Sequence, residues 1–242
     1  MIEKSPILVT GCARSGTSTI AGIINMCGAF GGNVAVANSN RRGMFENGCI
    51  RDNLVKPYLV RIGADPNGQY PLPVSISIPT TWKQLVEKVM LAEGYKGGDW
   101  LYKDTRMGLM WRVWNYAYPN AKWVIVRRRT GDVIQSCIKT GFMKAFNNQG
   151  NREAVNANTE EEAWLWWVHE YEKRFADMIM EGLNIKVVWP ERMVDGDFRQ
   201  LYELIDWLGL KWNPGAMVLI ESLLWGNKLK RKEATYGTGN VG

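Results

Sequence analysis

Residues 11–18 carry the groups of an anion-binding turn: Gly11, Cys12, Ala13, Arg14, Ser15, Gly16, Thr17 and Ser18. The apolar residues just before them predict a strand over residues 7–11, and small and apolar residues from position 17 predict a helix. A helix that begins at a glycine turn directs its unpaired N–H groups and the positive end of its dipole at one point. Arg14 adds a full charge with forked donors, so we expect this turn to bind a phosphate or a sulfate.

The turn departs from the loop that binds nucleoside triphosphates. That loop reads G-x-x-x-x-G-K-[ST], with a lysine that reaches the β- and γ-phosphates. The spacing of Gly11 and Gly16 is kept, but Thr17 replaces the lysine and the cation lies at Arg14 instead. The pattern therefore favours another phosphorylated ligand over Mg-nucleoside triphosphate. A tight turn without a ligand is the alternative, because glycine and serine are common in turns.

A second basic segment has the same layout. A strand expected over residues 122–126 ends in three consecutive arginines, Arg127 to Arg129. A helix expected over residues 132–140 follows and carries Ser136 one turn in. Adjacent arginines repel each other, and a phosphate would relieve that repulsion. A solvated basic patch is the alternative.

Strands and helices alternate along the chain. Further strands are expected over residues 100–103 and 185–188, and further helices over residues 81–92, 107–117, 160–180, 198–208 and 214–224. This alternation predicts an α/β, single-domain three-layer fold with a central parallel sheet and helices on both faces. Ligands of such sheets bind at the carboxyl ends of the strands. Arg14, Lys103 and Arg128 follow or end such strands, so we expect them in one cleft.

Composition agrees with one domain over residues 1–242. No apolar stretch of the sequence approaches the ~20 residues of a membrane span, and neither a membrane span nor a secretory leader is expected. The four cysteines lack metal-ligand spacing and predict free thiols in a reducing, cytoplasmic setting. A net charge of +6 suits an anionic ligand and requires no nucleic acid.

These segments together resemble sulfotransferases that use 3′-phosphoadenosine 5′-phosphosulfate. Residues 13–18 are similar to the family's G-R-S-G-T-S loop for the 5′-phosphosulfate, and Arg128 with Ser136 has the spacing of its 3′-phosphate site. Residues 100–106, 43–47 and 190–210 resemble the segments K-D-P-R, G-Y-W-E-N and Y-E-D-L-V…F-L-G-L. The similarity runs in order from about residue 6 to residue 212.

The resemblance implies sulfuryl transfer from this nucleotide to a hydroxyl or amine of a small-molecule or saccharide acceptor. It implies release of adenosine 3′,5′-bisphosphate and no metal. No stable membrane insertion is expected, and the sequence does not indicate an oligomeric state. The implied catalytic residues are Arg14, Lys103 and, as general base, Glu46; His169 is expected to be a core or surface residue. Asp104 and Arg106 are expected to form a structural ion pair. The implied cofactor-binding residues are Cys12, Ala13, Arg14, Ser15, Gly16, Thr17, Ser18, Arg128, Ser136, Arg231 and Lys232.

Three departures from the family pattern keep alternatives open. Thr105 stands where animal cytosolic members carry a catalytic histidine, Pro190 replaces a tyrosine, and only Arg231-Lys232 echoes the carboxyl-terminal loop over the 3′-phosphate. The alternatives are a P-loop nucleotide kinase or phosphotransferase and a non-catalytic relative that binds nucleotides or polyanions. Residues 28–43 and 141–158 are expected to be flexible loops and are candidates to fold over an acceptor, with ordinary surface loops as the alternative. The second loop has few anchors, and residues 226–242 are expected to form a flexible tail. Trp82, Trp111 and Trp114 are candidates to line an apolar acceptor pocket.

Overall fold

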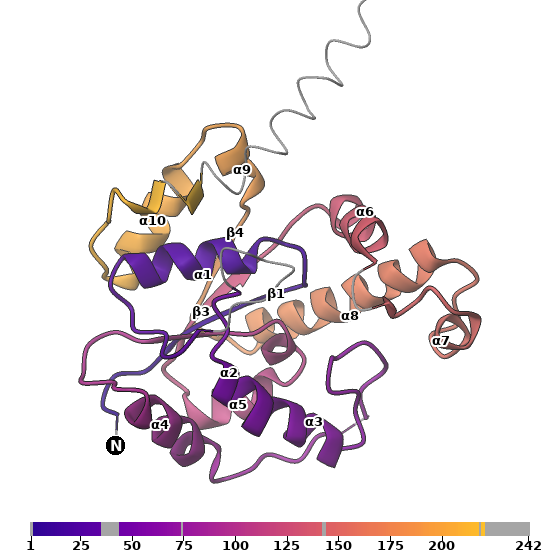
Figure 1. Ribbon diagram of the computed structural model, residues 1–242, viewed down its shortest axis with the longest axis horizontal. Helices are drawn as coiled ribbons and strands as arrows, with labels where there is room; N and C mark the ends of the chain where they lie inside the picture. The colour runs from indigo at the N-terminus through magenta and orange to yellow at the C-terminus, as the bar shows by residue number, and fades with distance from the viewer. Residues whose placement is uncertain (1, 35–43, 74, 142–143, 218, 221–242) are drawn as a thin grey trace, which may run out of the picture.

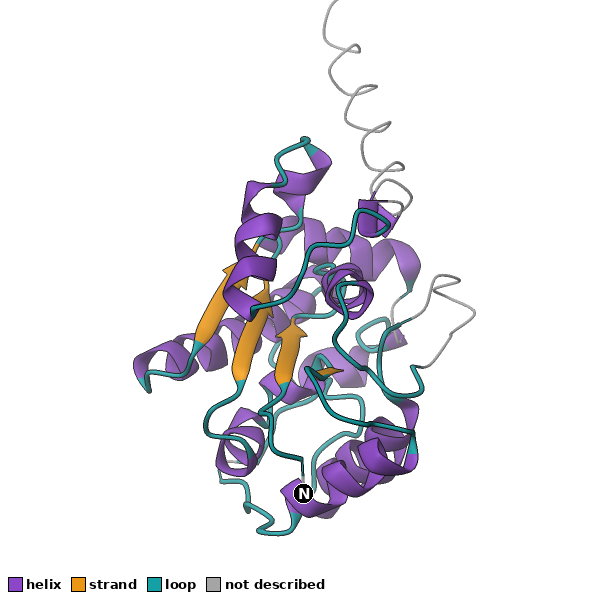
Figure 2. Cartoon of the chain, turned by 90° about the vertical axis from the view of Figure 1, so that its left-hand side faces the viewer, coloured by secondary structure: helices purple, strands orange, loops and turns teal. Residues whose placement is uncertain are grey.

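The computed structural model describes residues 2–34, 44–73, 75–141, 144–217 and 219–220 (Figure 1). Its centre is a parallel sheet of four strands in the order β2-β1-β3-β4. The strands are β1 (Ile7–Gly11), β2 (Leu101–Lys103), β3 (Lys122–Val126) and β4 (Ile185–Val188). The three longer arrows point the same way in Figure 2, and β2 pairs in parallel with β1, so the carboxyl ends of the strands lie along one edge of the sheet.

Side chains that alternate along the strands build a core on each face of the sheet. In β1, Leu8 belongs to one buried cluster, and Ile7 and Val9 belong to the other. The cluster of Ile7 and Val9 includes α1 (Thr17–Met26) and α10 (Arg199–Leu208). The cluster of Leu8 includes α4 (Trp82–Ala92), α5 (Trp111–Ala117), α6 (Thr130–Thr140) and α8 (Glu160–Met180). The expected three-layer α/β fold is confirmed.

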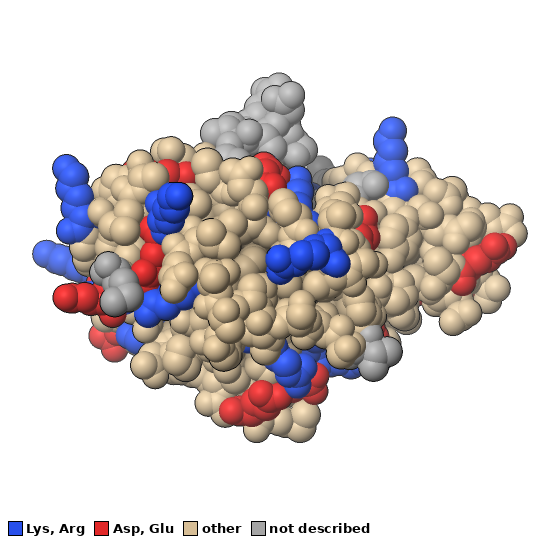
Figure 3. Space-filling view, turned by 90° about the horizontal axis from the view of Figure 1, so that it is seen from below, with Lys and Arg blue, Asp and Glu red and all other residues tan. Residues whose placement is uncertain are grey.

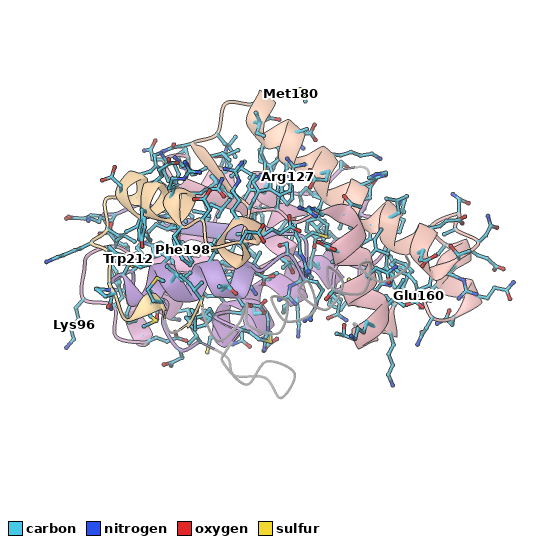
Figure 4. The ribbon with its side chains drawn as sticks, turned by 90° about the horizontal axis from the view of Figure 1, so that it is seen from above. Lys96, Arg127, Glu160, Met180, Phe198 and Trp212 are labelled. Carbon is cyan, nitrogen blue, oxygen red and sulfur yellow. The ribbon has the colours of Figure 1, made fainter. Side chains whose placement is uncertain are left out.

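Helix α8 is the longest helix among the described residues and crosses the molecule between the labelled residues Glu160 and Met180 (Figure 4). It begins in a capping box, in which the Thr159 side chain accepts a hydrogen bond from the backbone amide of Glu162. The Glu162 carboxylate in turn accepts one from the backbone amide of Thr159. Trp164, Trp167 and Tyr171 on its inner face are fully buried. These rings anchor the whole layer on that side of the sheet.

Shorter elements complete the described chain. They are α2 (Gly48–Ile50), the π-helical turn η1 (Arg51–Val55), α3 (Lys56–Arg61), the 3-10 turn η2 (Arg106–Gly108), α7 (Gln149–Glu153) and α9 (Glu191–Val194). The helix expected over residues 107–117 is therefore divided into η2 and α5, and α6 begins two residues earlier than expected. Residues 35–43 and 221–242 lie outside the described residues, and so do most of the first expected loop, the tail and the end of the last expected helix.

Two expectations about aromatic residues are wrong. Trp82, Trp111 and Trp114 are buried in the core, where Trp82 packs edge-on against Trp114 with ring centroids 5.6 Å apart, so they line no open pocket. The segment 141–158 does have anchors, because Phe146 is fully buried with its ring centroid 4.8 Å from that of Trp164. Burial of a large aromatic ring outweighs the polar composition that predicted an open loop.

The face seen from below, toward the amino ends of the strands, carries scattered charges. Lysine and arginine side chains there stand beside acidic ones (Figure 3). No helix within the described ranges has the length and apolar character that a bilayer crossing requires.

Gly11→Ala should lower the free energy of unfolding by about 1–3 kcal/mol, the usual cost of overpacking. A Cβ atom at Gly11 would lie 2.2 Å from the backbone oxygen of Val126 and 2.9 Å from Ser15 Oγ. Urea unfolding followed by tryptophan fluorescence measures the change. Gly131→Ala in α6 is the matched control, since its Cβ would meet nothing within 4 Å and alanine favours a helix. Equal losses in the two variants would contradict the close approach of β1 and β3.

Candidate functional site

The turn between β1 and α1 offers donors that the protein does not itself satisfy. Gly16 caps α1 in the left-handed conformation with φ 98°, and the first turn of α1 carries no acidic residue. The amides of residues 16–18 precede the first intrahelical bond and have no acceptor among the described residues. The hydroxyl of Ser15 is buried, unpartnered within the described ranges, and close to the position of a Cβ on Gly11. This donor set fits the oxygens of a phosphate or sulfate group.

Cys12 and Ala13 belong to the turn, but their side chains face the core. Both side chains are buried in the core cluster that includes α8, and the Cys12 carbonyl accepts a bond of 3.2 Å from the amide of Ser15. Burial, followed by the nearby Cys137 and Glu172, raises the pKa of the Cys12 thiol well above its usual value. Any contact of Cys12 or Ala13 with a ligand would therefore come from the backbone.

The two basic segments predicted from the sequence meet in the structure. Arg14 Nε donates to Ser136 Oγ over 3.0 Å, and Arg128 Nη1 donates to the backbone oxygen of Arg14 over 3.1 Å. These contacts span 122 and 114 residues of sequence. The parallel register that pairs Gly11 with Val126 brings the two turns together. Arg14 itself has a φ of 67°, a left-handed conformation that is uncommon for a residue with a side chain.

The three consecutive arginines have different partners. Arg127 pairs with Glu172 and lies over the ring of Trp189, 4.9 Å from its centroid, near the middle of the view in Figure 4. Arg129 lies 3.6 Å from a carboxylate oxygen of Glu191. Arg128 has no carboxylate partner within the described ranges. Of the three, Arg128 is thus the one whose charge remains for an anion.

A second charged cluster lies at the carboxyl end of β2. Lys103 Nζ donates to Glu46 Oε1 over 2.7 Å, and Arg106 Nη2 donates to Glu46 Oε2 over 3.2 Å. Arg51 Nη1 lies 3.5 Å from the same Oε2. Glu46, Lys103 and Arg106 are all buried, so the predicted base is held between cations from two segments of the chain.

The expected ion pair between Asp104 and Arg106 is confirmed. Arg106 Nε and Nη2 donate to the two carboxylate oxygens of Asp104 over 2.8 and 2.9 Å, and Tyr102 OH donates over 2.8 Å. Burial opposes ionisation of Asp104, but the charge of Arg106 and these hydrogen bonds outweigh it and lower the pKa. Asp104 is therefore a buried carboxylate that fixes the orientation of Arg106.

The backbone around Glu46 is fixed on both sides. Phe45 has a φ of 52°, and its ring packs at Gly22 of α1, where a Cβ would lie 2.8 Å from two of its atoms. Asn47 caps α2 by accepting a bond of 2.9 Å from the amide of Ile50, and its amide group donates to Glu93. The short segment 44–47 thus carries Glu46 into the buried cluster.

The structure separates the predicted residues into two groups. Arg14, Ser15, Gly16, Thr17, Ser18, Arg128 and Ser136 surround the β1–α1 turn, and Glu46 and Lys103 form the cluster at β2. The register pairs Val9 with Lys103, so both groups lie at the same edge of the sheet. Arg231 and Lys232 lie outside the described residues. His169 is on the exposed side of α8. No pattern in the sequence predicted that Arg106 and Arg51 contact Glu46.

A cavity of about 260 Å³ adjoins the basic turn and is lined by Arg129, Trp189, Glu191, Arg192 and Asp195. Burial and a hydrogen bond with Asp132 raise the pKa of Glu191 in its wall. Across the described part of the chain, no group of three His, Cys, Asp or Glu side chains could hold a metal ion. All four cysteines are free thiols, as expected.

Comparisons with known proteins bear on the fold of the chain. No protein-family model matches the sequence, and no curated protein is similar enough to match. The solved structure of sulfotransferase STF9 from Mycobacterium avium superposes with a TM-score of 0.54 at 10% identity, covering 92% of this chain and 68% of that one. This chain has the sulfotransferase fold.

Two further sulfotransferase structures are similar to the chain. The enzyme from Alicyclobacillus acidocaldarius gives a TM-score of 0.49 at 15% identity over 97% of this chain and 96% of that one. STF1 from Mycobacterium tuberculosis H37Rv gives 0.48 at 13% identity over 91% and 71%. The assignment of the sulfotransferase fold rests on the STF9 structure.

Asp104→Asn should lower the free energy of unfolding by about 3–5 kcal/mol at pH 7, because it breaks a buried ion pair. The folded pKa of Asp104 is depressed, so the stabilisation is complete above the unfolded value of about 4 and is lost as the pH falls through the folded value. The difference in the free energy of unfolding between the wild type and Asp104→Asn should therefore become smaller below about pH 4. Urea unfolding across a pH series measures it.

The control for this prediction is Asp99→Asn, which removes the partner of the exposed Lys4 at 3.0 Å. An exposed pair of this kind contributes at most about 1 kcal/mol. A loss in Asp104→Asn that is the same at every pH would show that the charge of Asp104 does not stabilise the fold.

Proposed function

We propose that this protein is a sulfotransferase that moves a sulfuryl group from 3′-phosphoadenosine 5′-phosphosulfate to a hydroxyl or amine acceptor. One observation carries the proposal: Arg14 of the first turn bonds to Ser136, and Arg128 of the second turn bonds to the Arg14 backbone. Two basic turns from distant parts of the sequence thus meet in the structure. Two guanidinium groups there have no carboxylate partner among the described residues. A nucleotide with anionic groups on both its 5′ and 3′ positions fits this pair of turns.

The nucleotide is the donor and, when bound, supplies an activated sulfuryl group for an in-line transfer similar to phosphoryl transfer. We assign the 5′-phosphosulfate to Arg14, the Ser15 hydroxyl and the amides of residues 16–18. Arg128 and Ser136 are assigned to the 3′-phosphate, as the family resemblance implies. Arginines then neutralise the ligand charge, so no metal is needed for binding.

The charged cluster at β2 is proposed to serve the acceptor. Lys103 is positioned at the strand end to contact the transferring group, and Glu46 is the proposed general base. A carboxylate has about four lone-pair positions. Lys103, Arg106 and Arg51 engage three of those on Glu46, with a single donor on Oε1. The position left on Oε1 can accept the proton of the acceptor.

A small-molecule or saccharide acceptor is proposed, in a cytoplasmic setting that suits the four free thiols. A nucleotide kinase is disfavoured because Thr17 replaces the lysine that contacts nucleoside triphosphates. A non-catalytic nucleotide-binding relative would bind the same ligand without turnover. A mass-based screen of acceptors with isotopically labelled donor therefore tests the reaction separately from binding.

Adenosine 3′,5′-bisphosphate should stabilise the protein without any metal. Ligand at 100 times its dissociation constant contributes about 2.7 kcal/mol, which raises the melting temperature of a domain of this size by about 5–10 °C. Differential scanning fluorimetry in the presence of EDTA measures the shift. A shift that needs Mg²⁺, or that ATP produces and the bisphosphate does not, would contradict the proposal.

Arg128→Ala should weaken binding of adenosine 3′,5′-bisphosphate roughly 10- to 150-fold, the value of one charge-assisted hydrogen bond. AMP lacks the 3′-phosphate, so its affinity should hardly change. Calorimetric titration of both nucleotides gives the comparison. Arg129→Ala is the control and should stay within about fivefold, since Arg129 is exposed and already faces Glu191. Equal losses for the two nucleotides would assign Arg128 another role.

Glu46→Gln keeps the shape of the side chain but removes its basicity, so the turnover rate should fall by about 10²–10⁴-fold. The affinity for adenosine 3′,5′-bisphosphate should change little, because Glu46 lies outside the β1–α1 turn. His169→Asn is the control, and its rate should stay close to that of the wild type. A fully active Glu46→Gln protein would remove Glu46 from the role of base and leave the nucleotide assignments intact.

A further inference from the structure

Arg106 joins two buried carboxylates from different parts of the chain. Its Nε and Nη2 atoms donate to Asp104 over 2.8 and 2.9 Å, and Nη2 also donates to Glu46 Oε2 over 3.2 Å. Glu46 is 60 residues away in sequence. Arg106 is therefore the link between the segment that carries the proposed base and the end of β2.

The orientation of this guanidinium is fixed from the Asp104 side. Asp104 also accepts the backbone amide of Arg106 over 2.9 Å and the hydroxyl of Tyr102 over 2.8 Å, and its side chain is completely buried. The amide of Asp104 donates to the backbone oxygen of Val9 over 3.2 Å. The forked contact is thereby tied to the sheet, and in particular to the strand that leads into the anion-binding turn.

Arg51 provides an internal comparison, because it touches the same oxygen of Glu46 in a weaker way. Its distance to Oε2 is 3.5 Å, and its main partner is Asp52, at 2.6 Å from Nη2 and 3.0 Å from Nε. The Arg51 side chain is 18% exposed, against 9% for Arg106. Arg51 supplies charge near Glu46, whereas Arg106 supplies a rigid donor.

We propose that Arg106 is a positioning residue for the reaction, and this inference rests on the sulfotransferase function proposed above. Arg106 holds Oε2 of Glu46 so that Oε1 faces Lys103 and the acceptor. This positioning requires the planar, forked guanidinium of an arginine and not a positive charge alone. A lysine at this position keeps the charge but cannot bond both oxygens of Asp104 and one of Glu46 in the same plane.

The test compares Arg106→Lys with Arg112→Lys, the same change in an exposed pair between α5 and Glu181. Turnover of 3′-phosphoadenosine 5′-phosphosulfate is followed with the best acceptor from the screen and with water alone. Arg106→Lys should lose about 100-fold in kcat, the cost of a catalytic group displaced by about 1 Å. The affinity of Arg106→Lys for adenosine 3′,5′-bisphosphate should match that of the wild type. Arg112→Lys should match the wild type in both kcat and this affinity.

A crystal structure of Arg106→Lys is the second readout, and it does not depend on activity. The contact of 2.7 Å between Lys103 Nζ and Glu46 Oε1 should be lost in the variant. Retention of that contact, or wild-type kcat in Arg106→Lys, would overturn the inference. A wild-type protein that binds the bisphosphate and never turns over the donor would instead refute the proposed function, and the structure would still decide the positioning.

Tyr102→Phe is the substitute variant for the kinetic test if Arg106→Lys does not fold. It removes only the hydroxyl that donates to Asp104. It keeps every charge of the cluster. A fall in kcat with unchanged affinity for adenosine 3′,5′-bisphosphate supports the inference, and a kcat equal to that of the wild type counts against it.

Discussion

The backbone pairing of β1 with its two neighbours brings the anion-binding turn, the arginine segment and Lys103 to one edge of the sheet. Val9 pairs with Lys103 on one side and with Val124 on the other, so three chain segments leave the sheet at the same edge. A slip of one residue would turn the side chains of a strand to the opposite face. The alternating packing of Leu8 and Val9 into separate cores prevents such a slip. The register of the sheet therefore fixes how the chain segments that leave this edge are aligned.

The two parts of the site, the cluster at β2 and the β1–α1 turn, differ in how their charges are buried and paired. The cluster at β2 is buried, and there each carboxylate, Glu46 and Asp104, has a cation in contact. Burying a charge without a partner costs several kcal/mol, so this cluster has to be nearly balanced. Arg14 and Arg128 are more accessible and have no carboxylate in contact among the described residues. Water can solvate these two cations until an anion replaces it, so this part can remain positive.

The sequence predicted the sheet closely because its strands are short apolar runs bounded by polar or glycine residues. The strand over 122–126 has the expected bounds, and β2 is one residue shorter than expected. Arg128 and Ser136, which the sequence singled out by their spacing, each bond to Arg14, and their role toward a 3′-phosphate stays a prediction.

Tertiary contacts account for the parts that the sequence did not predict. The helix expected from residue 107 is interrupted because Arg106 turns back to Asp104 through both backbone and side chain. Phe146 lies in a polar stretch, and only its packing on Trp164 shows that the stretch is anchored. The bond between Lys103 and Glu46 joins residues 57 positions apart, and no local pattern signals it.

The place of Cys12 beneath the anion-binding turn has a consequence for the redox behaviour of the protein. A cysteine reacts with oxidants and electrophiles as its thiolate, and a phosphate-binding loop would ordinarily favour that form through its positive potential. Here burial raises the pKa of Cys12, and its side chain points into the core instead of toward the ligand. Cys12 is only 5% exposed, which limits the access of bulky reagents to the sulfur. Burial thus disfavours oxidation of Cys12, although this cysteine lies within the proposed nucleotide-binding motif.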